Sequence, residues 1–372
     1  MFVNPSKDLL LSLLRAALFG EKPDASAFAE ADWKQIFHLA DMQTVSSLVL
    51  DGMGMLPTTV MRLSLDDKLV RFGKMQKMEC MNSLHRSVIV KIDKALKAEG
   101  IPAVFMKGQT VALRYPNPLH RTPGDIDFVV SPADFDWTMA VMEKMGKVDH
   151  GLVHEHHGMA WVDGVTVEPH YKVHNYQRPS TDRAMQEMFS SVFPDKLVCV
   201  EIDGHEISVF PPTFESVFLI SHMVNHVYEE GLGLRQVVDY AMFLSKCADR
   251  IDWMQHHEWL QRMRMERAWR IFTCICVTYL GLPLPSQVEP FSYNERKWAG
   301  KMMNDILQVG NFGRGEYVFL HRGMADAFHN YCWVAKRCLQ LGFVCQSEAR
   351  WWMISKVTRF FLKKKIEKGM KR

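Results

Sequence analysis

Two aspartates separated by one residue form the part of the sequence best suited to chemistry. Asp125 and Asp127 lie in the segment GDIDFVV (124–130), whose apolar residues predict a buried strand. Successive strand side chains point to opposite faces, so both carboxylates share one face, with Cα atoms roughly 6–7 Å apart. Two like charges this close repel each other unless a cation lies between them. The pair therefore predicts a site for Mg²⁺ or Mn²⁺, which prefer oxygen ligands.

A third acidic residue is needed to hold two such ions, and Glu168 is the best candidate. It lies in VTVEPHYKV (165–173), a predicted strand that can pair beside the aspartate strand and direct Glu168 to the same point. His170 shares the face of Glu168, because it follows two residues later. Such a set of carboxylates suits two-metal phosphoryl transfer, in which the ions activate an acceptor hydroxyl and hold a triphosphate.

A Lys-Gly turn upstream could contact the phosphates. Lys107 and Gly108 join a predicted strand (101–106) to a short helix (109–114). A glycine lets a phosphate approach the backbone, and a lysine adds positive charge. Arg121, four residues before Asp125, has two interpretations: a bidentate phosphate clamp, or a structural ion pair with Asp125 or Asp127. A catalytic Arg121 predicts that its loss costs far more activity than stability.

The histidines are numerous, and most do not by themselves indicate a site. HEHH (154–157) lacks the helical H-E-x-x-H spacing of a metal site. On a strand, His154 and His156 would share one face, which could line the substrate cleft, although a polar sheet face is favoured. His222 and His226 lie four residues apart on a predicted helix. They could bind a base or phosphate, or they could form a buried hydrogen-bonded pair.

The order of predicted elements indicates an α+β protein with three regions. Residues 1–100 are helical, residues 101–210 form a mixed β-sheet core, and residues 211–372 are helical again. Asp-Gly turns predict hairpins around residues 163–164 and 203–204. Expected helices include 6–19 capped by Ser6, a long helix 64–97, 132–145 capped by Ser131, and 234–247. Their expected buried faces include Leu84, Val88, Ile92 and Leu96 of the long helix and Trp137 of the helix 132–145.

Composition limits the class of protein. The chain has 372 residues, of which 48% are apolar and 23% charged, which is typical of a soluble globular protein. A net charge of +3 is too small to favour a nucleic-acid partner. None of the eight cysteines forms a C-x-x-C pair, which suits free thiols in the cytoplasm. No apolar run reaches the length of a transmembrane helix, and the basic, aromatic segment 351–372 is more readily a docked final helix than a membrane-surface or RNA-binding one.

The stretch KGQTVALRYPNPLHRTPGDIDFVV resembles the signature of an uncharacterised nucleotidyltransferase-like family, the NTP-transferase branch of the DNA polymerase beta superfamily. The resemblance extends over most of residues 6–245, including VTVEPHYKV, HMVNH and LRQVVDYAMFL. It implies a nucleotidyltransferase-type mixed β-sheet core flanked by N-terminal helices and a C-terminal helical domain. It also implies three metal ligands, Asp125, Asp127 and Glu168, and a nucleotide cleft formed by Lys107, Gly108, Arg121, Gly124, His170, His222, His226 and Arg235, with Asp239 nearby.

Two departures from the family pattern bear on activity. Lys107-Gly108 stands where the superfamily usually has Gly-Ser, so a hydroxyl contact to phosphate is missing. Pro169 follows the third acid where an aliphatic residue is usual. Because proline lacks an N–H, it must lie at a sheet edge or at a strand irregularity, and a displaced Glu168 would weaken the second metal site.

The sequence thus favours a metal-dependent nucleotidyltransferase that moves an NMP from an NTP such as ATP to a hydroxyl of a protein, a small molecule or an RNA end. The alternative is a catalytically weak or inactive nucleotide-binding or protein-interaction module of the same fold. A glycosidase is disfavoured, since its two acids normally come from separate strand ends.

Overall fold

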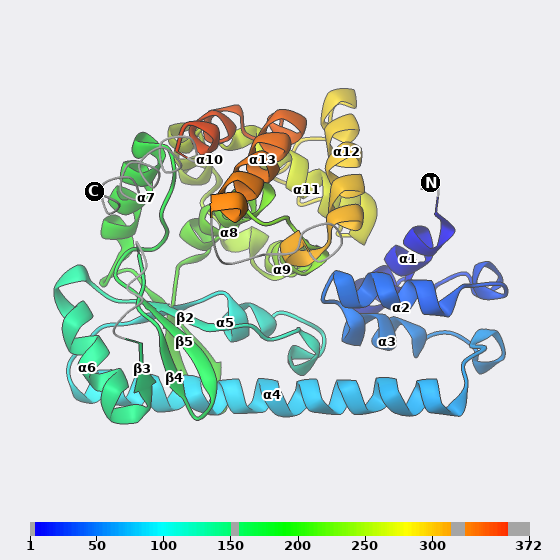
Figure 1. The fold of residues 1–372 in the computed structure, drawn as a ribbon, viewed down its shortest axis with the longest axis horizontal. Coiled ribbons are helices and arrows are strands. Elements are labelled where there is room, and N and C mark those ends of the chain that lie inside the picture. The colour runs from blue at the N-terminus through cyan, green and yellow to red at the C-terminus, as the bar shows by residue number, and fades with distance from the viewer. Residues whose placement is uncertain (1–3, 150–155, 314–323, 356–372) are drawn as a thin grey trace.

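The computed structural model describes residues 4–149, 156–313 and 324–355. One long helix, α4 (Leu65–Ala98), runs along one side of the molecule and connects its two ends. Three N-terminal helices lie at one end of α4, and a β-sheet lies at the other, with the C-terminal helices beside both (Figure 1). The predicted α+β class, a mixed sheet with helical regions before and after it, is confirmed.

The N-terminal helices follow their capping signals closely. They are α1 (Pro5–Phe19), α2 (Trp33–Met42) and α3 (Ser46–Met53). Gly20 ends α1 in the left-handed conformation, at φ 71°. The predicted cap at Ser6 is wrong: the side chain of Asn4 accepts the hydrogen bond from Ser6 N–H, and Pro5 takes the first helical position, where no N–H is needed.

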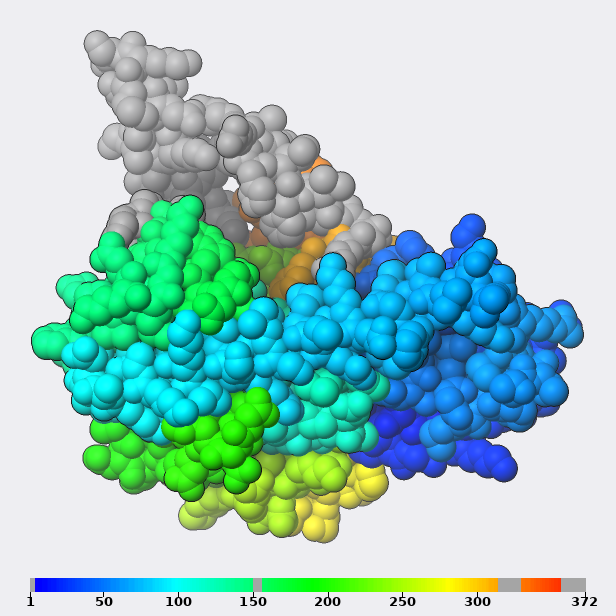
Figure 2. Space-filling model, turned by 90° about the horizontal axis from the view of Figure 1, so that it is seen from below, coloured from blue at the N-terminus to red at the C-terminus, as the bar shows by residue number. Residues whose placement is uncertain are grey.

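The buried residues of α4 all lie in its second half. Ser64 caps the helix as its sequence indicates, and Val88, Ile92 and Leu96 pack beneath the sheet. The prediction that Leu84 is buried is wrong, since 41% of it is exposed. Figure 2 shows α4 crossing the surface of the molecule, so the helical pattern in its first half does not face a core.

The main sheet has five strands in the order β1-β2-β5-β4-β3. Strands β2 (Ile126–Val129) and β5 (Val165–His170) pair in parallel at its centre, and the other pairings are antiparallel. The edge strands are β1 (Val104–Met106) and β3 (Lys147–Val148), and β4 (Ala160–Val162) lies between β5 and β3. The predicted turn between β4 and β5 is confirmed, with positive φ at Asp163 and Gly164.

Pro169 lies at an irregularity of β5, beyond the pairing of Val167 with Ala160, the first residue of β4. Its carbonyl accepts a hydrogen bond from Gly158 N–H (2.9 Å), so its ring nitrogen faces the same side, away from β2. Val130 N–H still donates to His170 O on the β2 side (3.0 Å). The proline therefore leaves the β2–β5 pairing intact and does not displace Glu168.

Smaller elements surround this sheet. They are α5 (Gly108–Ala112), α6 (Phe135–Met145), α7 (Pro179–Val192), and the separate hairpin β6 (Val198–Ile202) and β7 (His205–Val209). Ser131 caps the turn that leads into α6, as predicted. Trp137 is 59% exposed, against the prediction, because α6 packs on the sheet through Val141 and Met142 instead. Helix α7 has no counterpart among the elements predicted from the sequence.

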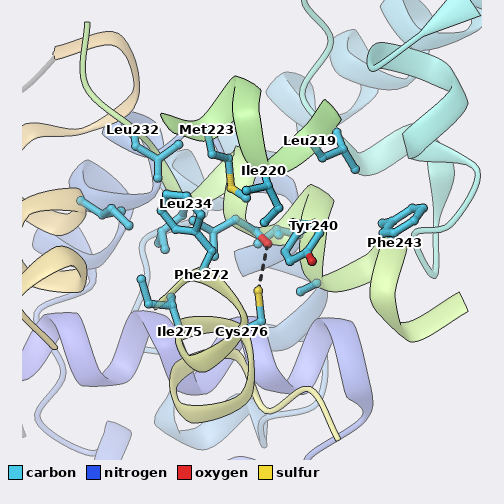
Figure 3. Packing of buried hydrophobic residues seen from close by; sticks show 14 of the residues in the cluster. Leu219, Ile220, Met223, Leu232, Leu234, Tyr240, Phe243, Phe272, Ile275 and Cys276 are labelled. Atoms are coloured by element: carbon cyan, nitrogen blue, oxygen red, sulfur yellow. Dashed lines mark hydrogen bonds between the residues drawn. The ribbon is translucent and has the colours of Figure 1, made fainter. Parts of the chain in front are cut away.

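The C-terminal helices share one apolar core with the N-terminal helices. They are α8 (Pro212–Tyr228), α9 (Leu234–Cys247), α10 (Trp253–Met263), α11 (Glu266–Leu280), α12 (Tyr293–Val309) and α13 (Met324–Leu341). Helix α11 contacts α1, α8, α9 and α12. Figure 3 shows this core around Leu234, Phe272 and Cys276, whose thiol lies 3.6 Å from Val237 O.

Short 3₁₀ turns complete the chain, at Ala25–Phe28, Thr58–Val60, Pro118–His120, Pro132–Asp134, Ala248–Arg250 and Asn311–Gly313. Among the described residues, no helix combines the length and the apolar character needed to cross a membrane. The basic final segment, from residue 356 onward, lies outside the described residues, as does His154.

Candidate functional site

The parallel pairing of β2 and β5 places two acidic residues directly opposite each other. Asp127 of β2 is the register partner of Glu168 of β5. Residues paired across parallel strands point to the same face, so both carboxyl groups meet on one side of the sheet. His170 lies on this face too, two residues beyond Glu168. The prediction that β5 lies beside the aspartate strand and directs Glu168 to the same point is confirmed.

Asp127 is the most tightly held of these groups. Its Oδ1 lies 3.1 Å from Lys107 Nζ and 3.0 Å from His170 Nε2. Burial alone would raise the pKa of Asp127, but the charge of Lys107 and the hydrogen bond from His170 outweigh it and hold the pKa well below its usual range. Asp127 is therefore a carboxylate at neutral pH.

Glu168 lies in the opposite electrostatic situation. Burial, and after it the charges of Asp127 and Asp125, raise the pKa of Glu168 to about 8. Its Oε2 is 3.8 Å from Nε2 of both His157 and His170, too far for a direct hydrogen bond. A partly buried acid with a raised pKa and, among the described residues, no direct hydrogen bond to a cationic group is the kind of group that a cation stabilises.

Donor atoms of three side chains converge at this point. One ligand atom each from Asp127, Glu168 and His170 lies within 4.8 Å of the other two. The two carboxylates offer the oxygen ligands that Mg²⁺ and Mn²⁺ prefer, and the Lys107 ammonium already places a positive charge there. Asp125 is outside this group of three. It precedes β2, and burial together with the charge of Asp127 raises its pKa.

The Lys107-Gly108 turn lies against both aspartates. Lys107, Gly108, Asp125 and Asp127 line the same small cavity. The backbone of Lys107 has φ 58° and ψ −148°, a region of backbone conformation that residues other than glycine rarely occupy. In the sequence pattern that this motif resembles, glycine is usual at this position. Lys107 therefore adopts a backbone conformation that suits the usual residue.

Arg121 does not take either of the positions predicted for it. Its Nε and Nη2 donate to Oδ1 and Oδ2 of Asp239, both at 2.8 Å, in a buried ion pair. Tyr115 O–H donates to the same carboxylate at 2.6 Å. Its partner is neither Asp125 nor Asp127. Nη1 donates to Thr122 O at 3.2 Å, and the side chain is buried, so the guanidinium is engaged within the chain. Arg121 instead joins the loop before β2 to α9.

Arg235 is the arginine that faces the aspartate loop. Its Nη1 lies 3.5 Å from Pro123 O, and its guanidinium lies over the ring of Phe312, 5.5 Å from the centroid. A Cβ built on Gly124 would lie 3.7 Å from Nη1. Burial, followed by the charge of Arg121, lowers the pKa of Arg235 to about 10. Among the described residues it forms no ion pair, so its charge remains available to an anion.

His222 and His226 are bonded to each other, with their Nε2 atoms 3.0 Å apart. Of the two interpretations, the structure has the hydrogen-bonded pair. The pair also extends toward the sheet, since His174 lies between His222 and His156, with ring centroids 5.9 Å and 5.4 Å away. Burial is the main cause that lowers the pKa of His174 and of His222 well below its usual value.

Two residues of α4 position the loop before Asp125, and sequence patterns did not single them out. Asn82 donates from its amide to Leu119 O (2.6 Å) and Arg121 O (2.9 Å). A ring nitrogen of His85 lies 2.8 Å from Gly124 O. The sequence did contain one indication of this role. Asn82 and His85 lie on the helix face that carries the buried apolar residues, and buried polar side chains need hydrogen-bond partners.

Comparison with known proteins identifies the family of the chain. A family model described as "Uncharacterised nucleotidyltransferase" matches residues 29–281, well over half of the chain. Among solved structures, the chain is similar to an antigenic nucleotidyltransferase-like protein from Paracoccidioides brasiliensis, with 14% identity, coverage of 43% of this chain and 74% of that one, and a TM-score of 0.29. No protein with a curated description matches it. The family match confirms the resemblance seen in the KGQ…FVV motif, and the chain belongs to this family of uncharacterised nucleotidyltransferases.

Proposed function

We propose that the protein is a Mg²⁺- or Mn²⁺-dependent nucleotidyltransferase that moves an NMP from an NTP to a hydroxyl acceptor. The observation that carries the proposal is the convergence of Asp127, Glu168 and His170, with donor atoms within 4.8 Å of one another. Family membership supports the reaction class, and the pairing of Asp127 with Glu168 across parallel strands supports these two carboxylates as ligands.

Asp127 and Glu168 are the residues that would hold the cation, with His170 beside them. Asp125 lines the same small cavity as Asp127 and is the candidate ligand of a second ion. A bound divalent cation would lower the pKa of the acceptor hydroxyl and offset the charge of the triphosphate. The raised pKa of Glu168 supports this assignment, since burial of its charge is costly without a nearby cation.

Lys107 and Arg235 are the cations that would bind the triphosphate. Lys107 Nζ is 3.1 Å from Asp127, so a metal ion that takes its place on the carboxylate leaves the ammonium to a phosphate oxygen. Arg235 lies beside Gly124, where a missing side chain leaves the backbone accessible. Neither contact requires the hydroxyl that the Lys107-Gly108 turn lacks.

A nucleotide-binding module without turnover is the second candidate, and one observation favours it. The Lys107 ammonium competes with a cation for Asp127, so metal binding is weaker than at an unoccupied pair of carboxylates. Both candidates predict metal-dependent nucleotide binding, and only transfer of the nucleotide separates them.

The test uses each of the four NTPs with a label on the α-phosphate. The protein is incubated with cell lysate and Mg²⁺ or Mn²⁺, and products are separated into protein, RNA and small-molecule fractions. Transfer of label in the wild type, lost in Asp127→Asn and Glu168→Gln and kept in the surface variant Asp136→Asn, supports the proposal. Binding of NTP without any transfer favours the module, and absence of both contradicts the proposal. The labelled fraction identifies the acceptor class.

A further inference from the structure

A cluster of histidines extends from the carboxylates toward the helical domain. The ring centroids of His156 and His157 are 4.5 Å apart, those of His157 and His170 5.0 Å, and those of His156 and His170 5.3 Å. These three rings come from two different segments, the end of β5 and the residues just before β4. Three imidazoles this close in a mostly buried place are unusual, because neutral rings gain little from one another and charged rings repel.

The backbone holds these two segments together. His157 and His170 form an isolated antiparallel bridge, and on either side Gly158 N–H donates to Pro169 O (2.9 Å) and Tyr171 N–H donates to His156 O (3.1 Å). His157 is 8% exposed and His170 2%. The rings are therefore positioned by a sheet and not by a loose loop, which is what a metal site requires of its ligands.

The nitrogens are close enough to share one ion. A ring nitrogen of each of His156, His157 and His170 lies within 4.8 Å of the other two. Zinc bound at 2.0–2.1 Å from nitrogen in a tetrahedron separates its ligand atoms by about 3.3 Å, so modest rotations of the rings would bring them to that spacing. Glu168 Oε2, 3.8 Å from Nε2 of both His157 and His170, is placed to be a fourth ligand.

The state of the rings also suits metal binding. Among the described residues, the buried Nδ1 of His156 has no hydrogen-bond partner, and a polar atom withdrawn from water in this way is unfavourable unless it gains one. A buried ring nitrogen without a partner is one that a metal ion can take as a ligand.

We propose that His156, His157 and His170 form a nitrogen-rich site for one first-row transition-metal ion of the Zn²⁺ class, adjacent to the carboxylate site and joined to it through His170 and Glu168. Imidazole nitrogen favours Zn²⁺ and Co²⁺ over Mg²⁺, whereas Asp127 and Asp125 offer the oxygen ligands that Mg²⁺ prefers. The two neighbouring sites thus select different ions. This site does not depend on nucleotide transfer, since its ligands are complete without a nucleotide.

The test is a titration of chelator-treated full-length protein with Zn²⁺ alone and, separately, with Co²⁺ alone. The visible absorption of bound Co²⁺ reports the geometry of its ligands. The wild type is expected to bind one ion with intense Co²⁺ bands typical of four-coordination. His156→Ala and His157→Ala should weaken binding by at least about 100-fold, since loss of even an indirect partner costs 10–100-fold. His38→Ala, on the exposed side of α2, should bind as the wild type does.

Two further variants keep the result interpretable. His157→Gln retains a polar side chain, and circular dichroism and thermal stability in chelator show whether each variant is folded. Asp127→Asn should retain Zn²⁺ binding. The proposal is overturned if the wild type does not bind Zn²⁺ at micromolar concentration, or if folded His156→Ala and His157→Ala bind it normally. It is also overturned if only Asp127→Asn loses the ion. Mg²⁺-nucleotide binding, measured on the same samples, reports the carboxylate site separately.

Discussion

The ammonium nitrogen of Lys107 lies 3.1 Å from Oδ1 of Asp127, and it is held there by a backbone that most residues avoid. The lysine begins a turn directly after β1, and the aspartate lies on the neighbouring strand β2. Their contact neutralises one carboxylate of the site and positions a cation where a triphosphate would bind. Mutation can separate two effects of Lys107 on the free energy of unfolding: the strain of its backbone conformation and the stabilisation from its ion pair with Asp127.

Replacing Lys107 with glycine should leave the protein more stable than replacing it with alanine. Both variants lose the ion pair, but only alanine keeps a Cβ in a conformation that costs about 1–3 kcal/mol. The greater unfolded-state entropy of glycine offsets about 0.5–1 kcal/mol of this. Urea denaturation should therefore place Lys107→Gly about 1 kcal/mol above Lys107→Ala, and equal or reversed stabilities would show that the turn is not strained.

Arg121→Ala should cost stability as well as activity. The buried Arg121–Asp239 pair loses one partner, which leaves an uncompensated charge and costs about 3–5 kcal/mol. Asp239→Ala should cost a similar amount, and the double variant less than the sum of the two, because the second change removes the unpaired charge. Chemical denaturation of all three variants measures this coupling. Additive losses would contradict a structural role for the pair.

Glu348→Gln should stabilise the protein at alkaline pH and have little effect in acid. Burial is the main cause that raises the pKa of Glu348 to about 7, against a hydrogen bond from Thr181 that lowers it. The folded protein thus keeps a proton that the unfolded chain releases above its ordinary pKa of 4.5. The free energy of unfolding therefore falls as the pH rises from 4.5 to about 7, by up to about 3 kcal/mol. Glutamine has no proton to lose, so unfolding free energies of wild type and variant should differ at pH 8 and converge near pH 4.5. A difference independent of pH would rule this out.

Two glycines in helices should respond in opposite ways to alanine. A Cβ on Gly52 of α3 would lie 2.1 Å from Leu13 O of α1, a contact that real side chains do not make. Gly52→Ala should cost about 1–3 kcal/mol through overpacking. A Cβ on Gly73 of α4 meets nothing within 4 Å, so Gly73→Ala should add up to about 1 kcal/mol through helix propensity. Thermal denaturation of both variants checks whether α1 and α3 pack this closely.

Local signals in the sequence predicted much of the scaffold. Ser131 caps the turn that leads into α6, and the Asp163-Gly164 turn joins two strands, because each of these residues acts on its own backbone. The convergence of Asp127 and Glu168 followed from strand alternation and from the expectation that β5 lies beside the aspartate strand, although the parallel sense of that pairing was not predicted. These parts of the site could be inferred without coordinates.

Long-range partners could not be inferred in this way. Asp239 is 118 residues from Arg121, and no local pattern links them. The approach of His157 to His170 depends on an isolated bridge beyond the end of β4. The exposure of Leu84 and Trp137 shows a related limit, since periodicity identifies a helix but does not say which part of it the rest of the chain covers.

The most direct test of the carboxylate site is calorimetric titration of Mg²⁺ into the protein saturated with a non-hydrolysable NTP. Mg²⁺ is chosen because the histidine cluster should not compete for it. The wild type and the surface variant Asp136→Asn should bind Mg²⁺ together with the nucleotide, whereas Asp127→Asn and Glu168→Gln, if folded, should bind it at least about 10-fold more weakly. Equal binding in all four proteins, or no Mg²⁺ binding in the wild type, would contradict the assignment of Asp127 and Glu168 as ligands of the catalytic cation.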